Sequence, residues 1–350
     1  MYHPRLQGSH YQMGRTMGHL FQKSGVRFPI RLDRFQQELG QESTALLEKH
    51  FPGAVDEIRG ITDTIGLDYR RFAAWMMCMG CCLDPAEHGS ESYSRDILRG
   101  CTAFAFVREG RNYYGRNNDL PPFMRAFSKS ILYRPEGSPG FLLNTSSFIN
   151  GEEGLNLSGL VVAMTFVVPR PAEIQPGLNS VFLVRYLLEH CTTVPEALQS
   201  LRRLPIASAC NILLADAAGN MVVAECCPTE VHVRTPETSR RGEPFIVTVN
   251  AFTSEQMRPH DGAPADMFYS RARFTTADNA LRKAAVHQPI EQAAALLSGG
   301  CGFMCSYPRA LNFDTIWSSI FDLSALHVLR AEGNPRRARY REDPRLAAGS

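Results

Sequence analysis

The sequence lacks any apolar run of about 18 residues or more, so we expect no membrane-spanning helix and no membrane partner. It also lacks an excess of one charge, because 37 Lys and Arg stand against 35 Asp and Glu and leave a net charge of +2. Without a broad positive field, nucleic acid is not an expected partner. The opening stretch Met1–Arg5 has no apolar signal core, and we therefore expect a cytoplasmic protein.

Repeats and phosphate-binding loops are missing as well. We find no internal repeat and no low-complexity block. The stretch Gly299–Gly302 is not followed by the Lys-Ser/Thr pair of a phosphate-binding loop, and no cofactor is expected. What remains is an ordinary globular composition, 44% hydrophobic and 21% charged over 350 residues, which suffices for one large domain or two medium ones.

Cysteine, by contrast, is plentiful, with 10 residues. In a cytoplasmic protein we expect them to be reduced and mostly to serve as small buried apolar residues. Two spacings, Cys78 with Cys81 and Cys301 with Cys305, could together supply four zinc ligands. The first pair lies in an apolar run without the turns of a zinc knuckle, so buried packing is favoured and no metal is expected.

Residues 1 to about 100 have the pattern of helices. Ser9 is a plausible N-cap, and apolar residues follow it at helical spacing as far as Phe21. Two further apolar faces lie at 58–67 and 72–79. The polar, turn-rich stretch Pro85–Ser94 is predicted to be an exposed loop.

The pattern changes at Cys101, where strands begin. Cys101–Val107 and a run starting at Tyr113 predict a hairpin. Further strands are predicted at Phe141–Leu143, Leu160–Val168, Ile212–Leu214, Met221–Ala224, Phe245–Val249, Thr315–Phe321 and Leu326–Arg330. Helices are predicted between them at Leu178–His190, Val194–Arg203, Met267–Val286 and Ile290–Leu297. This order indicates an α+β fold, with antiparallel sheets and helices layered outside them.

Cys101 is the strongest candidate for chemistry. It follows a glycine and opens a strand, so its thiol could face a cleft at the end of a sheet. Gly100 would tolerate the unusual backbone of a strained scissile peptide. If the thiol cleaved the Gly100–Cys101 bond, the new α-amine, with an ordinary pKa of about 8, could accept the thiol proton. One residue would then supply both nucleophile and base.

Three further residues are candidates to assist this cysteine. The predicted hairpin returns Arg116 and Asp119 to its side, where Arg116 could favour the thiolate and Asp119 could orient the amine. Asn250 ends an apolar strand and could donate to an oxyanion. Taken alone, the Arg–Asp pair is more often a structural ion pair, and Asn250 is equally well a turn residue.

Together these motifs resemble the penicillin acyltransferase family of cysteine N-terminal-nucleophile enzymes, relatives of the choloylglycine hydrolases. The resemblance rests on Gly100–Thr102, on Gly115–Asp119 and on the strand end Asn250–Phe252. It extends through Gly154–Leu160, Ala207–Asn211 and Ala215–Asn220. The ordered set is fairly specific, although no single motif is.

The resemblance implies a four-layer αββα sandwich. It also implies a zymogen that cuts itself into an α fragment, 1–100, and a β fragment, 101–350, which remain associated as one intertwined unit. Cys101 would be the nucleophile, Asp119 would lie near its amine, Asn250 would stand in the oxyanion hole, and Arg116 would correspond to the arginine beside the nucleophile of choloylglycine hydrolases.

Two positions depart from the family pattern. Ala251 replaces a usual His, and Thr165 stands where relatives often carry an Asn facing the site. Thr165 therefore remains a candidate for the oxyanion hole or pocket, and the second oxyanion donor stays open.

We expect a small N-acyl amide or acyl thioester as the substrate, handled by hydrolysis or by acyl transfer. Penicillin-type exchange, bile-salt-like deconjugation and N-acyl amino acid hydrolysis all fit. One alternative keeps the fold as an uncut binding or scaffold protein with an inert Cys101. Another is a papain-like hydrolase that uses one of the scattered histidines His190, His260, His287 and His327.

Overall fold

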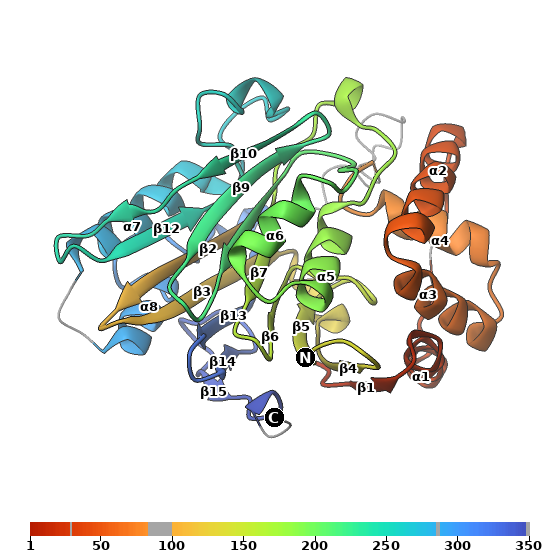
Figure 1. Ribbon diagram of the computed structural model, residues 1–350. Coiled ribbons are helices and arrows are strands. Elements are labelled where there is room, and N and C mark those ends of the chain that lie inside the picture. The colour runs from red at the N-terminus through yellow and green to blue at the C-terminus, as the bar shows by residue number, and fades with distance from the viewer. Residues whose placement is uncertain (29, 83–99, 285–287, 348–350) are drawn as a thin grey trace.

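The computed structural model covers residues 1–350 and describes all of them except 29, 83–99, 285–287 and 348–350. Two sheets lie face to face between helical layers (Figure 1). The eight-stranded sheet has the order β1 (Arg5–Gly8), β4 (Lys129–Pro135), β5 (Phe141–Thr145), β6 (Glu153–Asn156), β7 (Val161–Phe166), β8 (Cys210–Ala215), β9 (Met221–Cys227) and β10 (Glu230–Arg234). The seven-stranded sheet has the order β11 (Glu237–Thr238), β12 (Pro244–Thr248), β2 (Gly100–Arg108), β3 (Arg111–Leu120), β13 (Asp314–Asp322), β14 (His327–Ala331) and β15 (Arg341–Glu342).

Two pairs of helices cover the outer faces of the sheets. They are α5 (Ser180–His190) and α6 (Val194–Leu201) on the eight-stranded sheet, and α7 (Ser270–Lys283) and α8 (Pro289–Leu297) on the seven-stranded sheet. The predicted αββα sandwich is therefore confirmed. One detail differs from two purely antiparallel sheets, because β1 joins β4 in parallel.

Alternating side chains of β2 and β3 divide the core of the seven-stranded sheet into two faces. Ala103, Ala105 and Tyr114 point inward and pack against the eight-stranded sheet. Phe104 and Phe106 point outward and pack beneath α7 and α8. Because successive strand residues alternate between faces, this parity also decides on which side each polar residue of the hairpin lies.

The described part of the N-terminal segment contains the helices α1 (His10–Ser24), α2 (Arg34–His50), α3 (Pro52–Ile65) and α4 (Tyr69–Cys78). Ser9 caps α1 through a capping box with Gln12, which confirms the predicted start of that helix. The helices α1, α3 and α4 share a continuous apolar core with α5 and with strands of the eight-stranded sheet. None of the helices in the described ranges combines the length and the apolar character needed to cross a bilayer.

Several boundaries differ from the sequence prediction. The segment before residue 100 is not wholly helical, since β1 is a strand. The helix predicted from Met267 begins at Ser270, after a kink at Phe268 with a φ of 61°. The loop predicted at Pro85–Ser94 lies outside the described residues.

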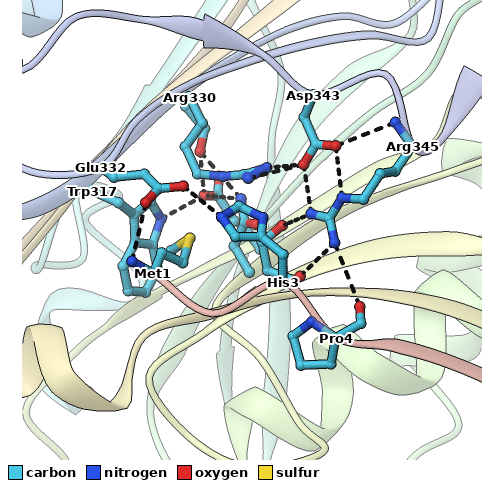
Figure 2. Close-up of polar contacts among 12 residues, drawn as sticks. Met1, His3, Pro4, Trp317, Arg330, Glu332, Asp343 and Arg345 are labelled. Atoms are coloured by element: carbon cyan, nitrogen blue, oxygen red, sulfur yellow. Dashed lines mark hydrogen bonds and ion pairs between the residues drawn. The ribbon is translucent and has the colours of Figure 1, made fainter.

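The first residues of the chain contact residues that follow β14 and β15, and Figure 2 shows these contacts. The Met1 amine lies 3.0 Å from a carboxylate oxygen of Glu332, and His3 lies 2.7 Å from the other oxygen. The Arg345 guanidinium contacts the Pro4 carbonyl and pairs with Asp343 at 2.6 Å. Residues from both ends of the sequence therefore form one polar cluster beside the eight-stranded sheet.

Candidate active site

The site lies where β2 begins and β3 ends. In the register of this hairpin, Cys101 stands opposite Asn118, and Ala103 stands opposite Arg116. Directly opposed residues of an antiparallel pair project from the same face. The side chains of Cys101, Arg116 and Asn118 therefore share the inner face, between the two sheets.

The Cys101 thiol has two partners on this face. Nη2 of Arg116 lies 3.0 Å from Sγ and 2.8 Å from Oδ1 of Asn118. Sγ itself lies 3.4 Å from the same Asn118 oxygen, to which it can donate. Arg116 also donates to the Met164 carbonyl of β7, so the opposite sheet holds the guanidinium in place.

Burial controls the protonation of the thiol. Cys101 is only 4% exposed, and this burial raises the pKa of the thiol above its ordinary value. Arg116 and Arg273 act in the opposite direction, whereas Asp119 adds to the rise. Because the net change in pKa is upward, the thiol of the uncut chain is protonated at neutral pH.

Asn250 contacts the backbone of the candidate nucleophile. Its Oδ1 accepts from the Cys101 N–H at 2.5 Å and from Nη2 of Arg273 at 3.1 Å. Since both partners can only donate, the oxygen of the amide must face them. Nδ2 of Asn250 donates to the Phe166 carbonyl at 3.0 Å, which uses one of its two hydrogens.

Arg273 is a site residue that the sequence analysis missed. It is fully buried, and it donates to the Cys101 carbonyl and, at 2.9 Å, to the Thr102 hydroxyl. Arg273, Ala277 and Leu281 form the buried stripe of α7. An arginine in phase with the apolar positions of an amphipathic helix was the available signal, because such a residue must be buried with partners.

Asp119 lies on the other face of β3 from the thiol. It accepts from Tyr307 at 2.6 Å and from Thr315 at 2.6 Å, and these are its side-chain hydrogen bonds among the described residues. The Asp119 backbone pairs with Gly100, so the carboxylate lies beside the candidate scissile bond without a hydrogen bond to Cys101. Burial raises the pKa of Asp119, although Arg273 and both hydroxyls oppose the rise.

The expectation about the backbone of Gly100 needs correction, whereas Thr165 stays a candidate whose contacts the structure gives. Gly100 does not have a positive φ, so backbone strain does not explain the glycine. Instead, a Cβ there would come within 2.7 Å of the Phe313 ring and 3.2 Å of Asp119. Thr165 donates its hydroxyl to the Val249 carbonyl at 2.7 Å and accepts from Asn211 at 3.1 Å.

No histidine takes part in the site as far as the structure describes it. His190 stacks on Tyr186, His260 pairs with Glu173, and His327 pairs with Glu342, while His287 lies outside the described residues. Across the same described ranges, no three His, Cys, Asp or Glu side chains form a group suited to a metal ion.

Two stacked sheets between helical layers, with a buried cysteine at the start of a central strand, define the class of N-terminal-nucleophile hydrolases. Within that class, residues 107–337 match the family model of acyl-coenzyme A:6-aminopenicillanic acid acyl-transferase. The match spans more than half of the chain, and the protein belongs to this family. The matched range begins six residues after Cys101, which therefore lies outside it.

Solved structures of other proteins are similar at low identity. Penicillin V acylase from Agrobacterium tumefaciens matches with a TM-score of 0.42 and 16% identity, over 66% of this chain and 83% of that one. A mutant of conjugated bile acid hydrolase from Clostridium perfringens matches with a TM-score of 0.45 and 12% identity, over 69% and 96%. A second variant of that hydrolase gives 0.45 and 13%, over 66% and 89%. No curated protein sequence matches the chain.

Proposed function

We propose that this protein is a self-processing amide hydrolase or acyltransferase that carries the acyl group of a small N-acyl amide as a thioester on Cys101. The observation that carries the proposal is the 3.0 Å contact between the buried Arg116 guanidinium and the Cys101 sulfur at the start of a central strand. A guanidinium favours the thiolate, and the thiolate is the nucleophilic form of cysteine.

Processing would begin with attack of Sγ on the Gly100 carbonyl carbon. As the new C–S bond forms, the thiol proton moves to the Cys101 nitrogen and the Gly100–Cys101 C–N bond breaks. Water then hydrolyses the thioester, which leaves a carboxylate on Gly100 and a free thiol and α-amine on Cys101. Asn250 supports this step, because its Oδ1 already holds the N–H of the scissile bond at 2.5 Å.

Turnover of substrate repeats the same attack, but the proton now passes from the thiol to the leaving amine through the free α-amine of Cys101. The free α-amine, with an ordinary pKa of about 8, takes the thiol proton and later gives it to the leaving amine. Asn250 orients the amine and has a second N–H available for the oxyanion. Asp119 lies beside the position that the amine would occupy, and Arg273 fixes both Asn250 and the Cys101 carbonyl. Water or an acceptor amine releases the acyl group.

The fragments 1–100 and 101–350 would stay together after the cut. Glu57 of the first fragment and Arg185 of the second are both fully buried and pair at 2.9 Å. The amine of Met1 in the first fragment pairs with Glu332 of the second. A cut at residue 100 leaves these contacts and the shared apolar core intact.

An uncut binding or scaffold protein is the second candidate. The low exposure of Cys101 and the raised pKa of its thiol favour it, because both describe an inert cysteine. Labelling with iodoacetamide near neutral pH separates the two candidates. An activated N-terminal cysteine reacts faster than Cys301, which is exposed, whereas an inert Cys101 reacts more slowly than Cys301.

Intact mass spectrometry of freshly purified protein tests the proposal directly. Wild type should give two chains that separate at Gly100–Cys101, and Cys101→Ala should stay whole. Processed wild type should hydrolyse at least one member of a panel of N-acyl amino acids, glycine and taurine conjugates and β-lactams. An intact wild-type chain, together with equal hydrolysis by wild type and Cys101→Ala, would eliminate the proposed mechanism.

A further inference from the structure

The proposed reaction requires hydrogen-bond donors for the oxyanion that forms when sulfur attacks a carbonyl. Asn250 has one uncommitted N–H, because the other donates to Phe166. The hydroxyl of Thr165 is not free, since its hydrogen goes to the Val249 carbonyl. A second donor must therefore come from another group within reach of the sulfur.

Asn118 places an amide within this reach. Its Oδ1 is 3.4 Å from the sulfur of Cys101 and accepts from Arg116 at 2.8 Å. Because a guanidinium has only donors, the atom that Arg116 contacts must be the oxygen. The nitrogen of the same amide, Nδ2, therefore has a fixed direction and cannot exchange places with the oxygen without losing the Arg116 bond.

Nδ2 of Asn118 is buried and has no hydrogen-bond partner among the residues that the structure describes. The residue is 1% exposed. Buried donors are nearly always paired in folded proteins, so one left open beside a nucleophile indicates a bond made only with a ligand or in a reaction. An unpaired buried N–H lowers the stability of the protein, and the contact with Arg116 holds the Asn118 amide in this orientation.

We propose that Asn118 Nδ2 is the second oxyanion donor, and that it acts with Asn250 on the tetrahedral intermediate bonded to Cys101. Asn118 lies on β3 and Asn250 lies two residues beyond β12, and these strands flank β2, which carries Cys101. Asn118 contacts the sulfur of Cys101, and Asn250 contacts its backbone N–H. Arg116 keeps the Asn118 amide oriented before substrate arrives, and this preorganisation is what makes such donors effective. The inference rests on the proposed function and assigns one of its missing groups.

The test compares Asn118→Asp and Asn118→Leu in the processed protein. Asn118→Asp retains the size and the oxygen but removes the N–H, and Asn118→Leu removes both polar atoms. Both should lower kcat about 100-fold on a substrate that wild type hydrolyses, with KM changed by less than about 3-fold, because the donor acts only in the transition state. The rate of iodoacetamide labelling against pH gives the thiol pKa of each variant independently.

Asn117→Asp is the matched control, with the same chemical change one residue away. Asn117 lies on the outer face, where its amide donates to the Leu297 carbonyl at 2.9 Å. This variant should be less stable but should keep the kcat of wild type per folded molecule.

Three results would overturn the inference while leaving the proposed function standing. They are an unchanged kcat in both Asn118 variants, a loss confined to KM, and a kcat loss that the shift in thiol pKa fully explains. If wild type itself is neither cut nor active, the proposed function fails instead.

Discussion

Arg185 in the helical layer and Arg116 at the candidate site are both fully buried, but the protein supports their charges differently. Arg185 pairs with Glu57 at 2.9 Å and with Glu189 at 3.0 Å, and its guanidinium lies 3.9 Å from the centre of the Tyr133 ring. Arg116 contacts a sulfur, an amide oxygen and a backbone carbonyl, and no described residue bonds to its Nε. Among the described residues, no carboxylate lies within ion-pair distance of Arg116.

This difference indicates that the charge of Arg185 stabilises the fold, whereas the charge of Arg116 is available for chemistry. Two carboxylates neutralise Arg185, so little of its field acts on other groups. Arg116 forms no contact ion pair among the described residues, although Glu153 and Glu152 act on its charge from farther away. In direct contact with it lies the Cys101 sulfur, which can become negative. An unpaired buried cation is costly, and a thiolate that forms during reaction offsets that cost.

The largest expected effect is on stability, at Arg185. Arg185→Met should reduce the free energy of unfolding by about 3–5 kcal/mol, because Glu57 would remain buried without a cation and Glu189 would keep only His10. Urea titration of the uncut Cys101→Ala chain, with and without the second change, measures this cost in a background that cannot process. A loss below about 1 kcal/mol would show that the network contributes little to the fold.

The same substitution at Arg116 should affect chemistry more than folding. Arg116→Met removes the charge beside Sγ, so the thiol pKa should rise and kcat should fall about 100-fold. The pH dependence of thiol alkylation and a kinetic comparison with wild type provide the two measurements. If Arg116→Met destabilises the protein as much as Arg185→Met does and leaves the thiol pKa unchanged, the two arginines have the same structural role.

The sequence predicted the place of Arg116 in this site, but it did not predict the contacts of Asn118 and Arg273. A short turn between two strand-like runs was enough to return Arg116 to the side of Cys101. The same pattern did not predict the contact between Cys101 and Asn118. That contact depends on the exact register of the hairpin, and a shift of one residue moves every side chain to the opposite face. Arg273 was missed because its place depends on how α7 docks across the sheet. The strand β1 was missed because four residues carry too little pattern.

Acid titration should reveal the ion network of Arg185. Burial alone would raise the pKa of Glu189, but Arg185 and His10 outweigh it and lower that pKa from 4.5 to about 2. Because the pKa of Glu189 is lower in the folded state, its ionisation stabilises the protein. This stabilisation is fully present above about pH 4.5 and is lost as the pH falls toward 2. Glu189→Gln should flatten this acid limb in chemical unfolding measured at pH 2.5, 3.5, 4.5 and 6, conditions chosen to span it at roughly unit steps. An unchanged acid limb would assign the loss of stability to other carboxylates.

The smallest expected effects come from removing one phenol hydroxyl in the Arg185 network and one at the candidate site. The Tyr133 hydroxyl donates to Glu57 at 3.1 Å, so Tyr133→Phe should cost about 1 kcal/mol of stability and leave the pH profile of activity unchanged.

The Tyr307 hydroxyl donates to Asp119 at 2.6 Å and stabilises the ionised carboxylate. Tyr307→Phe should therefore raise the pKa of Asp119 further and move the acid limb of kcat/KM to higher pH, because the proposed role of Asp119 requires its charge. Thermal unfolding and pH–rate profiles of both variants provide the comparison. If both variants lose the same stability and neither pH profile changes, Asp119 has a structural role, as Glu57 has.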